Sequence, residues 1–197
     1  MRRKGLVLVV MLGVVLLVTS ITEAFQNEPE GFRGVKWGDP PGEDMFSTDW
    51  VSKIRGFYKR VNENWEIGGA KLEKIEYHFH KGQFMEVNIK TQRNNHEPLE
   101  DVVKLKFGPG YSQENYSAED EWGFPYEDWL YRWFGDIATV TLKIRIWRYV
   151  SYGYLTIRST KIYNQYQEDM CREEEEEEAR RKEEERQKTP EEGLADF

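Results

Sequence analysis

The chain has 197 residues, of which 14% are aromatic, and a formal net charge of −8 at pH 7. A composition this rich in tryptophan and tyrosine excludes a wholly disordered chain and supplies the large side chains of one hydrophobic core. The single cysteine, Cys171, excludes an internal disulfide, so we expect core packing alone to hold the fold.

The N-terminal segment has the pattern of a secretion signal. Three basic residues among the first four precede an uncharged apolar run over 6–18, and Thr22 and Ala24 occupy the small-residue positions of a cleavage site. We expect a signal peptide over 1–24 and a mature protein that is periplasmic or secreted from a bacterial cell. No cysteine stands at the cleavage site, which excludes a lipoprotein. The alternative is an inner-membrane anchor formed by residues 6–21, the one way in which this chain is expected to meet a membrane.

Charge is unevenly distributed along the mature chain. Residues 25–167 contain 19 Lys and Arg against 21 Asp and Glu, whereas residues 168–197 contain 6 against 14. The body is nearly neutral and the acidity belongs to the C-terminal part. Without a basic patch, the counterion release that drives nucleic-acid binding is missing, so we expect no nucleic-acid partner.

Residues 25–163 are expected to form one domain built on antiparallel strands. The segments 71–80 and 84–91 both alternate apolar and polar residues, and Lys81-Gly82 between them has turn composition. This combination is typical of a β-hairpin with one buried face.

A second hairpin is expected later in the chain. Its arms are 137–149 and 154–160, and its turn is expected at residues 151–153. A shorter strand candidate precedes each hairpin, over 54–61 and over 128–134.

The best helix signal covers residues 97–108. Pro98 suits a first helical position and Gly108 suits the C-terminal cap. The expected apolar stripe consists of Leu99, Val102, Val103 and Phe107. A weaker helix is expected within 42–51.

The two halves of the domain resemble each other. V-K-W-G-D-P at 35–40 resembles L-K-F-G-P-G at 105–110, and the glycines of the two expected turns, Gly82 and Gly153, are 71 residues apart. This indicates an internal duplication, with convergence on strand-and-turn composition as the alternative. We therefore expect an α+β fold. It has an antiparallel sheet of about six strands in two related halves, one or two short helices on a face, and a charged C-terminal helix.

The segment 110–128 is expected to be one long loop. Its aromatic side chains stand among acidic residues and are candidates for binding, because loops of this length are often functional. They are Tyr111, Tyr116, Trp122, Phe124 and Tyr126. The alternative is that the loop folds back and covers one end of the sheet.

The C-terminal part is expected to be a charged helix over 164–188, followed by a disordered end over 189–197. Oppositely charged residues recur at helical i, i+4 spacing, and no apolar residue recurs at coiled-coil spacing. The pairs are Glu176 with Arg180, Glu177 with Arg181 and Glu178 with Lys182. Such a helix is expected to be solvated.

A metal or small-ligand site is the second candidate. Glu76, His78 and His80 alternate along one strand and so share a face, and imidazole and carboxylate are common metal ligands. The alternative is an exposed strand face without a ligand.

Motifs for catalysis are missing from the sequence. There is no G-x-S-x-G, no G-x-G-x-x-G and no phosphate-binding loop after Gly68-Gly69, and Cys171 lies among charged residues. We expect a non-enzymatic envelope protein without a cofactor. It would bind an envelope protein through an aromatic-rich sheet or the 110–128 segment, and its oligomeric state stays open.

The segment 31–38, G-F-R-G-V-K-W-G, resembles the mature N-terminus of a group of small exported bacterial proteins that open with F-R-G-x-x-W-G. Later segments fit the same group, which gives a resemblance over about 31–165. The resemblance implies export and brings no activity or functional residue with it. The charged tail departs from the pattern of the group.

Overall fold

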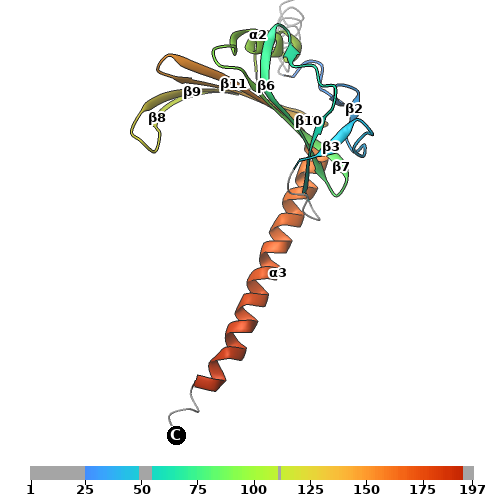
Figure 1. The fold of residues 1–197 in the computed structure, drawn as a ribbon, viewed down its shortest axis with the longest axis vertical. Helices are drawn as coiled ribbons and strands as arrows, with labels where there is room; N and C mark the ends of the chain where they lie inside the picture. Colours follow the sequence, from blue (N-terminus) through green and yellow to red (C-terminus); the bar gives the residue numbers. More distant parts are fainter. Residues whose placement is uncertain (1–24, 49–54, 111, 193–197) are drawn as a thin grey trace, which may run out of the picture.

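The structure is a computed structural model that describes residues 25–48, 55–110 and 112–192; the expected signal peptide lies outside these ranges. The chain is an α+β protein in which one large antiparallel sheet dominates (Figure 1). The elements of the first half are β1 (Gly31–Phe32), β2 (Val35–Lys36), β3 (Met45–Ser47), β4 (Arg55–Arg60), β5 (Glu66–Ile67), β6 (Ala70–His80), β7 (Gln83–Thr91) and α2 (Glu97–Phe107). Those of the second half are β8 (Ser112–Glu119), β9 (Pro125–Phe134), β10 (Ala138–Trp147), β11 (Val150–Ser159) and α3 (Thr160–Glu192).

The large sheet has nine strands in the order β3-β4-β6-β7-β11-β10-β9-β8, with β5 paired to β6. The expected fold class is confirmed, and the sheet is larger than the six strands expected. The extra strands are short or lie at an edge, where few side chains are buried and apolar alternation is weak.

The two halves repeat one topology. Each is a four-strand antiparallel meander followed by a helix, and the halves join where β7 pairs antiparallel with β11. The sequence matches quoted for the repeat are not equivalent positions: residues 35–36 form β2, whereas 105–107 end α2.

The turn of the second hairpin does not lie at the expected residues 151–153. Arg148, with a φ of 55°, and Tyr149 connect β10 to β11, and Gly153 lies inside β11. A Cβ on Gly153 would lie 3.2 Å from Leu99 and from Thr91. This glycine therefore serves the close approach of α2 to the sheet instead of a turn.

One face of the sheet carries the main core. Helix α2 covers it with Leu99, Val103 and Phe107, as the predicted stripe requires, while Val102 is only partly buried. Side chains of the N-terminal segment, Phe25, Phe32, Val35 and Trp37, also pack against this core. The largest fully buried side chains are Trp133, Tyr77, Phe79 and Phe84.

Helix α3 begins at Thr160, four residues before the expected start, and is described to Glu192. Its first turns are not merely solvated, because Ile162 and Tyr166 pack with Met85 of β7 in a second apolar cluster. Ile162 and Tyr166 are four residues apart and therefore lie on the same face of the helix. Beyond them α3 projects away from the body (Figure 1). The helix expected over 42–51 is wrong in its described part, where residues 45–47 form β3.

No helix within 25–48, 55–110 and 112–192 is long and apolar enough to cross a membrane. The apolar run over 6–18 lies outside the described residues.

Candidate functional site

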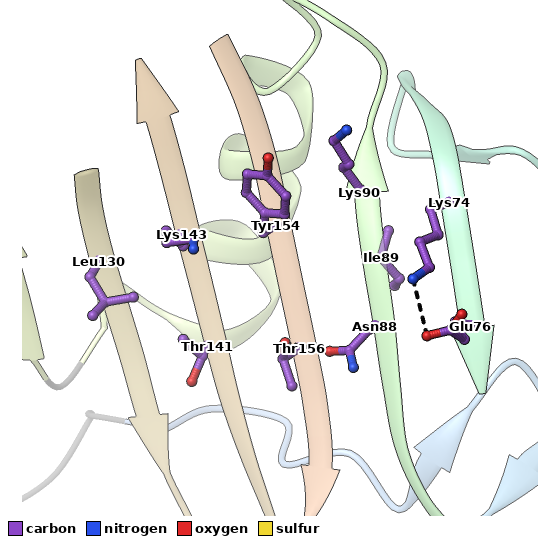
Figure 2. Close-up of a pocket in the computed structure, with 10 residues that line it drawn as sticks. All are labelled: Lys74, Glu76, Asn88, Ile89, Lys90, Leu130, Thr141, Lys143, Tyr154 and Thr156. Atoms are coloured by element: carbon purple, nitrogen blue, oxygen red, sulfur yellow. Dashed lines mark hydrogen bonds and ion pairs between the residues drawn. The ribbon is translucent and has the colours of Figure 1, made fainter. Parts of the chain in front are cut away.

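The sheet face opposite α2, here called the open face, carries two adjoining hollows. The sheet is arched, and α3 projects on its concave side (Figure 1). The first hollow has a volume of about 550 Å³ and is lined by Lys74, Glu76, Asn88, Ile89, Lys90, Leu130, Thr141, Lys143, Tyr154 and Thr156 (Figure 2). The second has about 490 Å³ and is lined by Lys90, Asp120, Glu121, Trp122, Tyr126, Arg145, Trp147, Tyr152 and Tyr154. Lys90 and Tyr154 belong to both.

Strand pairing sets the order of side chains in the first hollow. Lys143 of β10 lies opposite Tyr154 of β11, Tyr154 lies opposite Lys90 of β7, and Lys90 lies opposite Lys74 of β6. These four residues form one cross-strand line, here called the lysine row. Neighbouring strands are about 4.8 Å apart, so the row extends over roughly 14 Å.

Two of the three lysines of the row, Lys90 and Lys143, pack against tyrosine rings. The Lys90 amine lies 4.4 Å from the centroid of the Tyr152 ring, and the Lys143 amine lies 4.9 Å from that of Tyr154. Both distances are within the range of a cation–π interaction. Because the rings are already engaged by amines, the row presents positive charge more than bare aromatic faces.

The ion pairs of the row leave it positive. Lys74 pairs with Glu76 at 3.1 Å and Lys90 pairs with Glu73 at 3.0 Å. Lys143 makes no ion pair with any residue in the described part of the chain. Burial lowers the pKa of Lys90, but the hydrogen bond to Glu73 and the nearby Tyr154 outweigh it and raise this pKa above its ordinary value.

A buried carboxylate braces the open face beside the row. Asp128 of β9 accepts two hydrogen bonds of 2.7 Å from Arg145 of β10 and one of 2.8 Å from the Tyr116 hydroxyl of β8. The Asp128 side chain is fully buried. Burial raises its pKa, but the hydrogen bonds from Arg145 and Tyr116 outweigh it and lower this pKa below its ordinary value. Asp128 is therefore ionised and neutralises Arg145.

The segment 110–128 is not a long loop. It contains β8, a turn and the start of β9, and the carboxylate of Asp120 accepts hydrogen bonds from the backbone N–H groups of Trp122 and Phe124 in the turn. Strand β8 lies at the edge of the sheet and its side chains are mostly exposed. Its sequence therefore lacks the apolar alternation that identifies a half-buried strand.

The five aromatic residues predicted in this segment do not form one group. Trp122 and Tyr126 line the second hollow, and Tyr116 lies next to it on Asp128. Phe124 lies instead beneath Arg148, at 4.2 Å, and Tyr111 lies outside the described residues.

The lysine row was not identified from the sequence as a site. The alternation along three different strands only places Lys90, Lys143 and Tyr154 at outward positions. The available signal was lysine and tyrosine at outward positions of long strands, but it has meaning only once those strands are known to be neighbours.

His78 is buried, not on an exposed strand face. Its Nε2 lies 2.8 Å from a Glu76 oxygen, and its Nδ1 lies 2.8 Å from Glu86 and 2.9 Å from Arg55. Burial raises the pKa of Glu86, but the hydrogen bond with His78 and the nearby charges outweigh it and leave this pKa below its ordinary value.

His80 belongs to a different network. Its Nε2 lies 2.8 Å from the Asp169 carboxylate of α3, which also accepts a hydrogen bond from Lys81. The structure thus brings Glu76 next to His78 but directs the His80 ring toward α3. Among the described residues, no group of three or more His, Cys, Asp and Glu side chains is arranged to hold a metal ion.

The hydrogen bonds of Asp169 predict how the free energy of unfolding depends on pH. The hydrogen bond from Lys81, with those from His80 and Arg172, lowers the pKa of Asp169 from 3.8 to about 2. A carboxylate with a lowered pKa contributes stability above its unfolded pKa and loses it as the pH falls through the folded pKa. Between pH 4 and pH 2 the parent protein should therefore lose more stability than Asp169→Asn, measured by urea unfolding at each pH. Identical losses in the two proteins would contradict this role.

Comparison with models of known protein families, with curated proteins and with solved structures gave no match. The fold and the open face therefore define this protein as an α+β sheet protein covered by a helix on one side.

Proposed function

We propose that this chain is a non-enzymatic, exported binding protein whose open face holds an acidic segment of a protein in the bacterial envelope. The observation that supports this most is the lysine row. Lys74 and Lys90 lie directly opposite each other, and each has its own carboxylate partner, Glu76 and Glu73. The third lysine, Lys143, makes no ion pair with any residue in the described part of the chain, so its charge is available to an anionic ligand.

The charge around the first hollow favours an anionic ligand. Three lysines line it against one carboxylate, that of Glu76, although the body as a whole is slightly acidic. An extended acidic segment laid across the strands would meet Lys143, Lys90 and Lys74 in succession. Lys143 and Lys90 are two strand spacings apart, with Tyr154 between them, and Lys90 and Lys74 are one spacing apart.

The second hollow supplies the side chains that dominate protein interfaces. Trp122 is 67% exposed there, and Tyr126, Trp147 and Tyr152 line the same hollow. Aromatic residues and arginine are enriched in protein interfaces. A protein partner therefore fits both hollows better than a small anion does.

The proposal of a binding protein rests on the charge of the row together with the aromatic lining of the second hollow.

The test is a calorimetric titration of the whole chain with a soluble Glu-Ser repeat peptide. Lys143→Glu should weaken binding about tenfold, a loss of about 1.4 kcal/mol, and Lys90→Glu combined with Lys143→Glu should abolish it. Lys36→Glu, an exposed change of the same charge on β2, should leave affinity unchanged. Equal weakening by Lys36→Glu and Lys143→Glu, or undiminished binding by the double variant, would refute the proposed site.

A further inference from the structure

A small apolar cavity lies on the other side of the sheet, away from the open face. It has a volume of about 220 Å³ and lies between α2, the β1–β2 hairpin and β11. Its apolar lining includes Phe32, Ile67, Val103, Phe107, Leu155 and Ile157. The cavity is separate from the two hollows, so its test is independent of the proposed function.

The shape of the cavity is held by close contacts around it. Gly68, with a φ of 56°, brings the turn before β6 against α2, where a Cβ would lie 2.7 Å from Val102. The floor residues Leu155 and Ile157 are buried in the main core. Close packing of these core residues gives the cavity, which is open to solvent on one side, a fixed apolar floor.

Two cations stand at the cavity, and only one of them is available to a ligand. The guanidinium of Arg33 is bonded to Glu63 and to the backbone oxygens of Asn64 and Glu66. Lys106 is exposed and makes no ion pair with any residue of the described ranges. The Lys106 amine lies 5.5 Å from the centroid of the Phe107 ring, which also lines the cavity. An apolar space with an ammonium group at its edge that makes no ion pair is complementary to an alkyl chain that ends in a carboxylate.

We propose that this cavity binds one medium-chain alkyl carboxylate, with its chain among Val103, Phe107 and Leu155 and its carboxylate at Lys106. An apolar cavity of about 150 Å³ is large enough to bind benzene, and this one is larger. It is smaller than the roughly 300 Å³ at which pockets for drug-sized ligands begin. The ligand is therefore a single short chain and not a two-chain lipid.

The experiment is a calorimetric titration of the whole chain with butanoate, hexanoate and octanoate, and with octan-1-ol. We expect saturable binding of one octanoate per chain and an affinity that rises with chain length, because each buried CH₂ adds apolar contact. Lys106→Gln should weaken octanoate about tenfold and leave octan-1-ol unchanged. Lys161→Gln, an exposed lysine at the start of α3, is the matched control.

Filling the cavity gives the decisive result. Val103→Phe should abolish octanoate binding, and Leu155→Phe is a second filling variant in case the first fails to fold. Leu105→Phe adds the same bulk at a position of α2 that is 84% exposed and should bind as the parent does. The proposal is wrong if no saturable octanoate binding occurs, if affinity is independent of chain length, or if a folded filling variant binds like the parent.

Discussion

Replacing Trp133 by alanine should lower the free energy of unfolding by about 4 kcal/mol, the typical cost of removing a fully buried aromatic side chain. Trp133 has no exposed surface, and its ring packs against Phe107 of α2 and Tyr131 of the same strand. Its indole N–H donates a hydrogen bond of 3.2 Å to the backbone oxygen of Gly108. The substitution therefore removes contacts that fasten α2 to the second half of the sheet.

Equilibrium unfolding in urea, followed by far-ultraviolet circular dichroism, measures this loss. Trp122→Ala is the matched control, because Trp122 is 67% exposed, and it should change stability by less than about 0.5 kcal/mol. Similar losses in the two variants would mean that Trp133 does not belong to the main core.

The second large effect is expected at Asp128. Asp128→Ala should cost about 3 kcal/mol, because it leaves the Arg145 guanidinium on the sheet without the carboxylate that neutralises it. The value stands at the low end for a buried ion pair, since the Arg145 side chain is partly exposed and water recovers some of its charge. The hydrogen bond from Tyr116 is lost in the same variant.

A double-mutant cycle separates the pair from the general cost of substitution. The cycle consists of Asp128→Ala, Arg145→Ala and the double alanine variant. The double variant should cost much less than the sum of the two single variants, because no unpaired charge remains in it. Glu114→Ala is the control: its ion pair with Arg132 joins β8 to β9, the neighbouring strand pair, and the Glu114 side chain is about half exposed. The loss should therefore be below about 0.5 kcal/mol. Additive losses for the two single substitutions would mean that the Asp128–Arg145 ion pair does not stabilise the sheet.

The parts of the fold that were predicted correctly are those whose side chains carry a one-sided pattern. The hairpin of β6 and β7 was predicted because both arms bury one face and its turn contains Lys81-Gly82, both with positive φ. Helix α2 was predicted because its apolar stripe and its end signals agree. Both patterns arise from contacts that are local or that recur at a fixed spacing.

The errors have equally physical causes. Strand β8 was predicted as a loop because an edge strand exposed on both faces carries no alternating pattern. Gly153 was read as a turn residue, although it is needed for close packing against Leu99. The start of α3 was placed late because Ile162 and Tyr166 show a helical stripe only once β7 is known to lie beneath them.

By itself, the sequence determined the fold class, the two hairpin-bearing halves and the separation of a near-neutral body from an acidic tail. These properties follow from composition and from periods of two or of three to four residues. Only the tertiary structure decided which strands are neighbours. Pairing of β7 with β11 places Lys90 opposite Tyr154, and pairing of β10 with β11 places Lys143 opposite the same ring. The lysine row exists because residues distant in sequence lie opposite each other on neighbouring strands, and a local sequence pattern does not predict which strands are neighbours.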